Sequence, residues 1–466
     1  MNSPLSADLD AALDRIAGSI DAGQPQSAVV AAIAARSQWP HEVEPARLHG
    51  IALFQLGQIA NARRALDDAR AIAPQSVEVA CNLASVLLAE GDTIGAISVL
   101  DAMLAREPRH PAVLNGLGTA KRAAGDLAGS RDAYARATAE APAHAAAWMN
   151  LAAVELALGH VAKADHDTRH ALTLAPAHPE GLLLLGHVLA TQRRHADAER
   201  AYLAGAQSAP SDARFAYQAG LMAEEQGRLA PAADAHARAL SLTPSLHHAL
   251  GQLVFLRRQL SDWRGLDALS ADLRARVAAG APGIAPFAFL AEPASADEQL
   301  RCARTCADGI DARTATQRTR FPFVHRQRRS TDPLRIGMVA NGFGNHPTSL
   351  LIVAMIEALR SDAIEIHLFS TAPDDSSVLL HRLRAAVHTL HDASSATAPV
   401  LAATIHAADV ELLLDLDGYC SGAMPEALAL RPAPIQINWL AYPGTLGAAW
   451  MDYVIADAVV LPRSLH

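Results

Sequence analysis

A proline recurs at a constant interval through the first half of the chain, and no other feature restricts the fold so strongly. The series comprises Pro40, Pro74, Pro108, Pro142, Pro176, Pro210 and Pro244. A second series with the same spacing comprises Gly23, Gly57, Gly91, Gly125, Gly159 and Gly227, and Arg193 interrupts it. A third comprises Ala28, Ala62, Ala96, Ala164, Ala198 and Ala232, and Ser130 interrupts it. Repetition with one fixed period predicts a solenoid built from one repeated unit.

Each unit is predicted to be a pair of antiparallel helices. Glycine suits the turn between them, small residues suit the place where they cross, and proline ends the second helix. The spacing of about 34 residues and the register resemble the tetratricopeptide repeat (TPR) over about seven units. Aromatic residues make up 4% of the chain, which also favours closely packed helices. We expect a TPR superhelix over residues 1–280, in which residues 247–280 form a capping unit.

The first helix of some units carries an amide side chain at one repeat position. Asn82 and Asn150 occupy this position two units apart, and Gln218 occupies it two units further on. A side-chain amide can hydrogen-bond both the N–H and the C=O of a peptide backbone without reading its side chains. We therefore predict that these three residues bind protein or peptide acceptors in the groove of the superhelix. The alternative is that they are solvated polar positions.

The periodicity changes after residue 280. Residues 281–333 contain one predicted helix near residues 297–307 and end in an arginine-rich stretch, which we interpret as a solvated linker rather than a targeting or nucleic-acid patch. From residue 334, β-type apolar runs alternate with helical ones, as in a parallel, doubly wound sheet. Strands are predicted at 334–339, 364–369, 410–416, 435–440 and 453–456. We expect residues 334–466 to form a Rossmann-like lobe.

Composition argues against several classes of protein. The chain has 39 basic and 48 acidic residues, and this net charge of −9 disfavours a general nucleic-acid or anionic-membrane surface. No run reaches the roughly 18 apolar residues that span a bilayer, so we expect a cytoplasmic protein without membrane contact. The cysteines are too few and too scattered for a disulfide or zinc framework, and we expect reduced thiols and no metal at Cys81, Cys302, Cys306 and Cys420.

The loop at residues 342–349 is the predicted centre of any chemistry. A strand runs into it and a helix leaves it, and ligands of open α/β sheets bind beyond the carboxyl ends of strands and against helix N-termini. Two glycines let the backbone approach a ligand, and Pro347 stiffens the segment that presents His346. Thr348 and Ser349 are predicted helix caps. The glycine patterns of dinucleotide-binding and P-loop proteins are absent from the sequence.

Several motif blocks give the chain its resemblance to a known family. They are Gly-Phe-Gly-Asn-His-Pro-Thr-Ser at 342–349, Asp-Gly-Tyr at 417–419, Leu-Arg-Pro-Ala-Pro-Ile-Gln-Ile-Asn-Trp-Leu-Ala-Tyr-Pro-Gly-Thr-Leu-Gly-Ala at 430–448 and Met-Asp-Tyr-Val-Ile-Ala-Asp at 451–457. Together with the TPR units, they resemble the O-linked N-acetylglucosamine (O-GlcNAc) transferases and the related SPINDLY-type transferases. The resemblance implies a GT-B glycosyltransferase, inverting and independent of metal or cofactor. It would move GlcNAc from the nucleotide sugar UDP-GlcNAc to Ser or Thr of proteins held by the superhelix.

The resemblance also implies roles for individual residues. His346 matches the active-site histidine of the family, either as a general base or as a hydrogen-bonding group for donor or acceptor. Animal members carry an acidic residue where this chain has Gly342, which argues against a mechanism that needs that carboxylate. The other matches are implied substrate-binding residues, namely Asn345, Pro347, Thr348, Leu440, Ala441, Tyr442, Pro443, Gly444 and Thr445.

The reading of the chain as an enzyme has two alternatives. One is a SPINDLY-type protein O-fucosyltransferase that uses GDP-fucose, and the other is a non-catalytic TPR adaptor. The loop at 430–448 argues against the adaptor, because an adaptor has no evident need for a Gly- and Pro-rich loop beside His346. A GT-B enzyme also has a second lobe that holds the nucleotide, and we recognise one lobe here. We therefore expect this chain by itself to be inactive.

Overall fold

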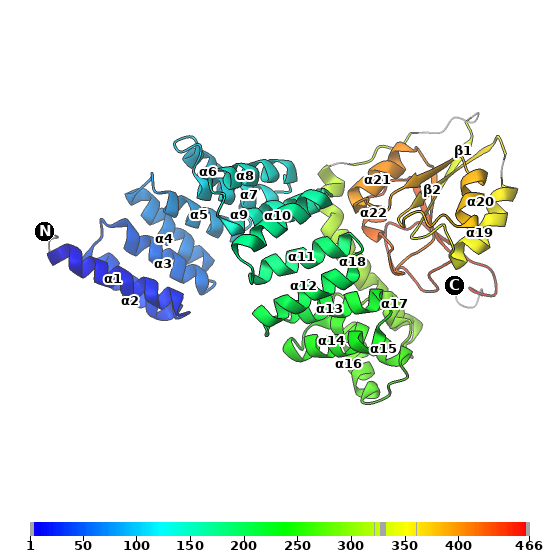
Figure 1. The fold of residues 1–466 in the computed structure, drawn as a ribbon, viewed down its shortest axis with the longest axis horizontal. Helices are drawn as coiled ribbons and strands as arrows, with labels where there is room; N and C mark the ends of the chain where they lie inside the picture. Colours follow the sequence, from blue (N-terminus) through cyan, green and yellow to red (C-terminus); the bar gives the residue numbers. More distant parts are fainter. Residues whose placement is uncertain (1–3, 321, 327–331, 360, 463–466) are drawn as a thin grey trace. The chain divides into compact units, whose positions relative to one another are not determined.

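The structure is a computed structural model that describes residues 4–320, 322–326, 332–359 and 361–462. It divides into two compact units, residues 1–208 and 209–466. The first unit is helical, and the second contains further helices and a six-stranded sheet (Figure 1). The predicted fold class, a TPR array followed by an α/β region with a parallel sheet, is confirmed. The division between compact units falls inside the array, and the domain boundaries at 280 and 333 stay a prediction.

The first unit is a series of helical hairpins that repeat with the period of the sequence. From α3 onward, the first helices of the hairpins begin at the interval of the proline series, and the second helices do so from α2 onward. The helices are α1 Pro4–Asp21, α2 Pro25–Gln38, α3 Val43–Gln55, α4 Ile59–Ile72, α5 Val77–Ala89, α6 Thr93–Leu104, α7 Pro111–Ala123, α8 Leu127–Glu140, α9 Ala145–Ala157, α10 Val161–Leu174, α11 Pro179–Thr191 and α12 His195–Ser208.

The turn inside each hairpin requires a left-handed backbone. Gly57, Gly91 and Gly125 have φ of +71°, +84° and +78°. Arg193, which interrupts the glycine series, adopts the same conformation with φ of +58° although it carries a Cβ. The geometry of the repeat is therefore kept where its sequence mark is lost.

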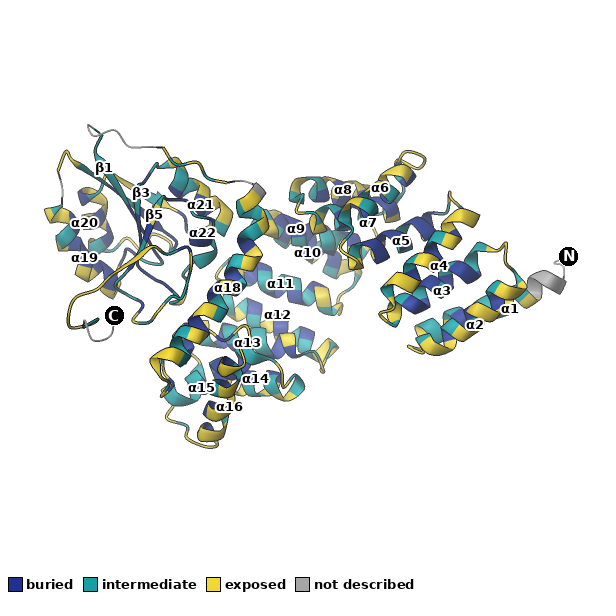
Figure 2. Ribbon diagram, turned by 180° about the vertical axis from the view of Figure 1, so that it is seen from behind, coloured by how far each residue is buried: buried dark blue, intermediate teal, exposed yellow. Residues whose placement is uncertain are grey.

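Small residues on the first helix of a hairpin make room for a large residue on the second. A Cβ on Gly118 would stand 2.6 Å from the ring of Tyr134, which is fully buried. The Tyr134 hydroxyl hydrogen-bonds Thr119 Oγ1 at 2.8 Å. Ser130, which interrupts the alanine series, is also fully buried and donates to the Gly118 carbonyl at 2.7 Å. Figure 2 shows the resulting pattern, with buried residues on the sides of the helices that face their neighbours.

The second unit begins with two more hairpins of the same kind. Helices α13 and α15 begin at the same interval as the hairpins before them, and Ser261 takes the left-handed position with φ of +54°. The segment predicted as a capping unit therefore keeps the geometry of a repeat after the Gly and Pro marks have faded. The helices are α13 Ala213–Glu225, α14 Leu229–Leu242, α15 His247–Gln259, α16 Leu266–Ala278, α17 Pro286–Phe289 and α18 Ala296–Arg320.

Helix α18 corrects the sequence-based reading of residues 281–333. The helix predicted near 297–307 continues to Arg320, so the arginine-rich stretch begins inside a helix and not in a linker strand. The helix extends because successive parts of it pack against different neighbours. Cys302 joins a hydrophobic cluster with α15 and α16, and Ile310 joins one with the sheet. Arg318 donates to the Ala429 carbonyl at 2.9 Å, and residues 321 and 327–331 lie outside the described part.

The sheet is parallel throughout, with strand order β3-β2-β1-β4-β5-β6. Strand β3 was not predicted, because it is a short edge strand with only partly buried side chains. The predicted strand at 410–416 is shorter, at Leu412–Asp415. The elements are β1 Leu334–Ala340, α19 Pro347–Ala358, β2 Ile364–Ser370, α20 Val378–Ala386, β3 Thr389–Asp392, α21 Ala398–Ala407, β4 Leu412–Asp415, α22 Pro425–Ala429, β5 Ile435–Trp439 and β6 Tyr453–Ile455.

Helices cover both faces of the sheet. Helices α19 and α20 pack on one face around Met338, Ile352 and Leu383, and α21 and α22 pack on the other around Leu401 and Leu413 (Figure 1). The connections change from one face to the other between β1 and β4, which are adjacent in the sheet. In open α/β sheets this switch point is where loops part and ligands bind.

Candidate active site

The loop between β1 and α19 places His346 at the start of a helix. His346 is the N-cap residue of α19, and its Nδ1 accepts a hydrogen bond from the Thr348 N–H at 3.2 Å. Pro347 takes the first helical position, where its missing N–H is no loss. The prediction that Thr348 and Ser349 cap the helix is therefore wrong, because the proline starts the helix earlier and both residues are buried in its first turn.

This hydrogen bond decides what the histidine ring can do. Because Nδ1 accepts a hydrogen bond, a neutral His346 imidazole carries its proton on Nε2. In that tautomer Nε2 is a hydrogen-bond donor and has no lone pair for a proton. His346 is exposed, as are its neighbours Asn345 and Pro347. The arrangement suits a group that donates a hydrogen bond to a ligand oxygen.

The loop after β4 contains two buried carboxyl groups. Asp415 is 4% exposed, and its Oδ1 accepts from the N–H groups of Asp417 at 3.1 Å and Gly418 at 3.0 Å. Its Oδ2 accepts from Asn438 Nδ2 at 3.2 Å. Asp417 is 8% exposed and accepts from the Asn341 N–H at 2.5 Å. Desolvation raises the pKa of both carboxyl groups, and it raises the pKa of Asp417 to about 7.

The loop after β5 begins with a backbone conformation that is unusual for its residue. Leu440 has φ of +88°, in the region that favours glycine. The Ala441 N–H donates to the Leu416 carbonyl at 3.3 Å, which ties this loop to the end of β4. Tyr442 is buried against Gly418, where a Cβ would stand 2.6 Å from the Tyr442 Cβ. The loop therefore depends on a close contact with the loop after β4.

The residues predicted to bind substrate form two groups at the carboxyl edge of the sheet. One group follows β1 and the other follows β5, and the loop after β4 contacts both. Their exposure differs, and their role in binding stays a prediction. The exposed members are Asn345, His346, Pro347, Pro443 and Thr445, the half-buried ones are Leu440, Ala441 and Gly444, and the buried ones are Thr348 and Tyr442.

The sequence-based selection missed the carboxyl groups that hold these loops. Asp375, in the loop after β2, accepts from the Asn345 N–H at 2.6 Å through Oδ2. Asp417 does the same for Asn341 after β4. One signal was available in the sequence, since acidic residues follow two buried strands at the edge where ligands bind.

The amides predicted to bind peptide lie on first helices of the array. Asn82 on α5 is half-buried, and its Nδ2 has no hydrogen-bond partner among the described residues. Asn150 on α9 donates through Nδ2 to Asn115 Oδ1 at 3.0 Å. Asn115 was missed because it lies one residue out of the repeat register. Gln218 on α13 belongs to the second compact unit, and peptide binding by the three amides stays a prediction.

One of the four cysteines, Cys420, lies in the loop after β4. All four thiols are free, and burial raises the pKa of Cys81, Cys306 and Cys420 to about 11. Within the described ranges, no three His, Cys, Asp or Glu side chains are grouped as metal ligands would be. Among the helices described, none combines the length and apolar character needed to cross a membrane.

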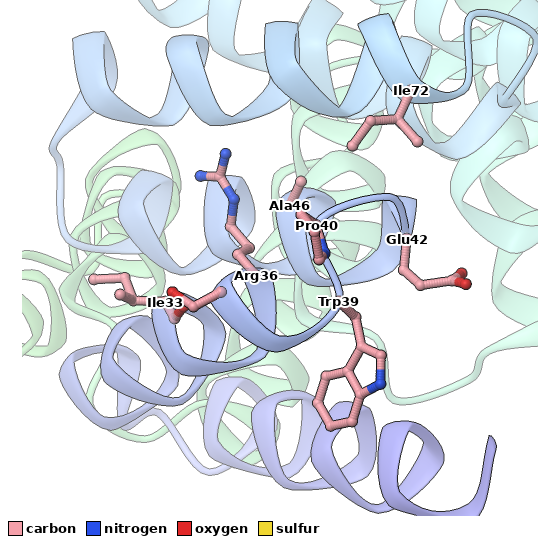
Figure 3. A pocket seen from close by; sticks show the side chains of 8 residues that line it. Ile33, Arg36, Trp39, Pro40, Glu42, Ala46 and Ile72 are labelled. Atoms are coloured by element: carbon pink, nitrogen blue, oxygen red, sulfur yellow. Dashed lines mark hydrogen bonds between the residues drawn. The ribbon is translucent and has the colours of Figure 1, made fainter. Parts of the chain in front are cut away.

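A pocket of about 320 Å³ lies in the first unit and is separate from this site (Figure 3). It is lined by residues of α2, α3 and α4 and of the turn between α2 and α3. Its cation, Arg36, is already paired with Asp68 at 2.6 Å and bonded to His49 Nδ1 at 2.9 Å. The lining residues are Ile33, Arg36, Ser37, Trp39, Pro40, Glu42, Ala46 and Ile72.

Comparison with known protein families gives matches in both halves of the chain. Residues 281–466 match glycosyl transferase family 41. Residues 47–112, 81–143, 115–179 and 183–247 match the tetratricopeptide repeat. The family 41 match includes the loops after β1, β4 and β5, which form the candidate active site.

Individual relatives match parts of the chain. The probable UDP-N-acetylglucosamine–peptide N-acetylglucosaminyltransferase SEC of Arabidopsis thaliana is 30% identical over 190 residues, which are 39% of this chain and 19% of that protein. The UDP-N-acetylglucosamine–peptide N-acetylglucosaminyltransferase of Caenorhabditis elegans is 38% identical over 148 residues, which are 31% of this chain and 13% of that protein. The match thus spans less than a fifth of either relative. A solved structure of a Thermobaculum terrenum O-GlcNAc transferase mutant is 21% identical with a TM-score of 0.42, covering 69% of this chain and 55% of that one.

Proposed function

We propose that the chain, which carries a family 41 region after its TPR repeats, is a glycosyltransferase of the O-GlcNAc transferase and SPINDLY type and that the protein glycosylates Ser or Thr of other proteins. The proposed donor is UDP-GlcNAc, and the proposed reaction inverts the anomeric centre without a metal ion. The observation that carries the proposal is the joining of the loops after β1, β4 and β5 at one edge of a parallel sheet. The names of the two relatives support the choice of donor.

In this proposal His346 donates a hydrogen bond and is not the general base. Its Nδ1 is occupied by the Thr348 N–H, so Nε2 carries the proton of the neutral ring. A donor of this kind stabilises negative charge that develops on an oxygen during transfer. Gly342 supplies no base either, because its φ of +139° disfavours any side chain there, including a carboxylate, so in this proposal the proton of the acceptor hydroxyl leaves to a group at neither position.

The proposed acceptor is a protein segment held by the helical array. Asn82 and Asn115 lie on first helices of the first unit, and Asn150 joins Asn115 through a side-chain hydrogen bond. An amide such as Asn82 Nδ2, buried without a partner among the described residues, is suited to a backbone carbonyl of a bound peptide. Amides read the peptide backbone and would accept many sequences.

Labelled transfer by the complete gene product tests the donor. The protein is incubated with radiolabelled UDP-GlcNAc and, separately, with GDP-fucose, each with and without a chelator. We expect label on protein from UDP-GlcNAc at the same rate in both conditions. Label from GDP-fucose alone would establish the fucosyltransferase instead, and a rate that falls with chelator would overturn the metal-free mechanism. If the folded protein transfers sugar from neither donor, the result would favour the alternative of a non-catalytic TPR adaptor.

A further inference from the structure

The loop that carries His346 is held at both ends by carboxyl groups from the neighbouring strands. The Asn341 N–H donates to Asp417 Oδ2 at 2.5 Å, and the Asn345 N–H donates to Asp375 Oδ2 at 2.6 Å. Strand β1 lies between β2 and β4 in the sheet, and each of these neighbours supplies one carboxyl group from the loop that follows it. Hydrogen bonds therefore join this loop to the loops that follow both strands adjacent to β1.

We propose that Asp375 and Asp417 are positioning residues that fix this loop at both ends and thereby set where His346 stands. The proposal rests on the proposed function, because the position of His346 matters for transfer only if the loop is part of the active site. Neither carboxyl group needs to touch the substrate. Each acts through the backbone of the loop.

The Asp417 side of this arrangement is built into the core of the sheet edge. Asp417 is 8% exposed, and a buried carboxyl group requires hydrogen-bond donors. Its own backbone is fixed by Asp415 Oδ1, and Asp415 in turn accepts from Asn438 on β5. Asn341 makes a second bond to this loop, from its Nδ2 to the Ser421 carbonyl at 3.2 Å. The first end of the loop is thus connected through β4 to β5.

The Asp375 side is exposed but closely fitted. A Cβ on Gly344 would collide with the Asp375 carboxylate, so the glycine allows the carboxylate to approach the loop backbone. Asp375 Oδ1 also accepts from the Ser377 N–H at 3.0 Å, which fixes the carboxylate against the start of α20. The bond from the Asn345 N–H is the largest cause that lowers the pKa of Asp375. Bonds to an ionised carboxylate are shorter and stronger than bonds between neutral groups.

The two glycines explain why the loop needs this support. Gly342 and Gly344 lie between the two bonded amides, and glycine has more backbone freedom to lose on ordering than any other residue. An active-site group must be held within about 0.5 Å of its working position. A loop with two glycines meets this demand when both of its ends are fixed.

Hydrogen exchange of the unliganded full chain tests the arrangement without any transferase assay. The variants are Asp375→Ala, Asp417→Ala and, as a matched control, Asp374→Ala, whose carboxylate pairs with Arg384 at 2.9 Å instead of with the loop. We expect exchange in residues 341–346 to become about tenfold faster or more in the first two variants, because each removes the side-chain acceptor that holds one end of the loop. We expect no change in the control. Exchange at the wild-type rate in folded Asp375→Ala and Asp417→Ala would overturn the proposal.

Kinetics of the complete gene product test the consequence for transfer. We expect Asp375→Ala to lower kcat/KM for the donor by about tenfold or more, and Asp375→Asn to restore most of it, because asparagine keeps an acceptor oxygen for the Asn345 N–H. Asp374→Ala should leave kcat/KM unchanged. A wild-type kcat/KM in Asp375→Ala would contradict the positioning role. If wild type transfers nothing, the proposed function fails, and the exchange rates alone decide whether the loop is fixed as we propose.

Discussion

Different kinds of contact hold the helical array and the α/β lobe together. In the array, one kind of contact recurs in unit after unit, as when Gly118 packs against Tyr134 and Gly50 against Leu66, each on the partner helix of its own hairpin. At the candidate site, each contact occurs once and joins distant parts of the chain, such as Asn341 and Asp417, which are 76 residues apart. We therefore expect the array to confine the effect of a local change, and we expect the candidate site to depend on single hydrogen bonds.

The largest expected effect is a loss of stability in the array that stays local. Tyr134→Ala removes a fully buried aromatic side chain and should lower the free energy of unfolding of its region by about 3–5 kcal/mol. Tyr134→Phe, the control, loses only the bond to Thr119 and should cost about 1 kcal/mol. Hydrogen exchange should rise in α7 and α8 and stay unchanged in residues 415–418. A matching rise at the site would abolish the contrast between the two regions.

Titration of Asp417 should produce the next largest effect. Burial raises its pKa from 3.8 to about 7, so the folded state binds more protons than the unfolded state between these values. The stability contributed by protonated Asp417 is full below pH 4 and is lost as the pH rises through 7. Asp417→Asn does not titrate, so its free energy of unfolding relative to wild type should rise by about 3 kcal/mol between pH 4.5 and pH 8. Urea denaturation at both pH values measures this, and a pH-independent difference would contradict it.

Two glycine substitutions sharpen the comparison, because one has a close neighbour and the other has none. Gly447 has φ of +60°, and a Cβ would stand 2.8 Å from the backbone nitrogen of Arg304 on α18. Gly280 has φ of +71° and open space around it. Gly447→Ala should therefore cost about 2–4 kcal/mol, from strain and overlap together, and Gly280→Ala only about 1–2 kcal/mol. Equal losses in thermal unfolding would show that α18 does not hold this loop closely.

The smallest expected effect is a gain in stability in the array. Arg193 has φ of +58° at a position where other units carry glycine, so Arg193→Gly should stabilise the protein by about 1 kcal/mol. Gly159→Ala is the reciprocal change and should destabilise it by a similar amount. Chemical denaturation would measure both, and effects of the same sign would contradict the equivalence of the two turns.

The sequence predicted the array well because every unit carries its own marks. Glycine and proline at a constant interval placed the hairpins and their turns, including the turn at Arg193. The elements that were missed lack such marks. Strand β3 is short and only partly buried, and the far end of α18 is helical because it packs against the sheet. Tertiary packing of this kind leaves no periodic pattern in a sequence.

The sequence indicated where the loops of the candidate site lie, but it did not indicate which carboxyl groups hold them. Strands that alternate with helices form parallel sheets, so the loops after β1 and β5 were expected at one edge. The bonds from Asp375 and Asp417 were not predictable, because they join residues 30 and 76 apart and follow from the order of strands in the sheet. The cap of α19 was assigned to Thr348 and Ser349 because hydroxyl residues are the commoner caps, whereas His346 fills this role.

Transfer by the complete gene product, compared between wild type and two histidine variants, tests the central claim most directly. The variants are His346→Ala and, as a control, His381→Ala, which removes an exposed histidine on α20. We predict that His346→Ala lowers the rate of sugar transfer from UDP-GlcNAc to protein by about 10²-fold or more, and that His381→Ala keeps the wild-type rate. Transfer at the wild-type rate by His346→Ala would contradict the claim that the loop after β1 forms the active site.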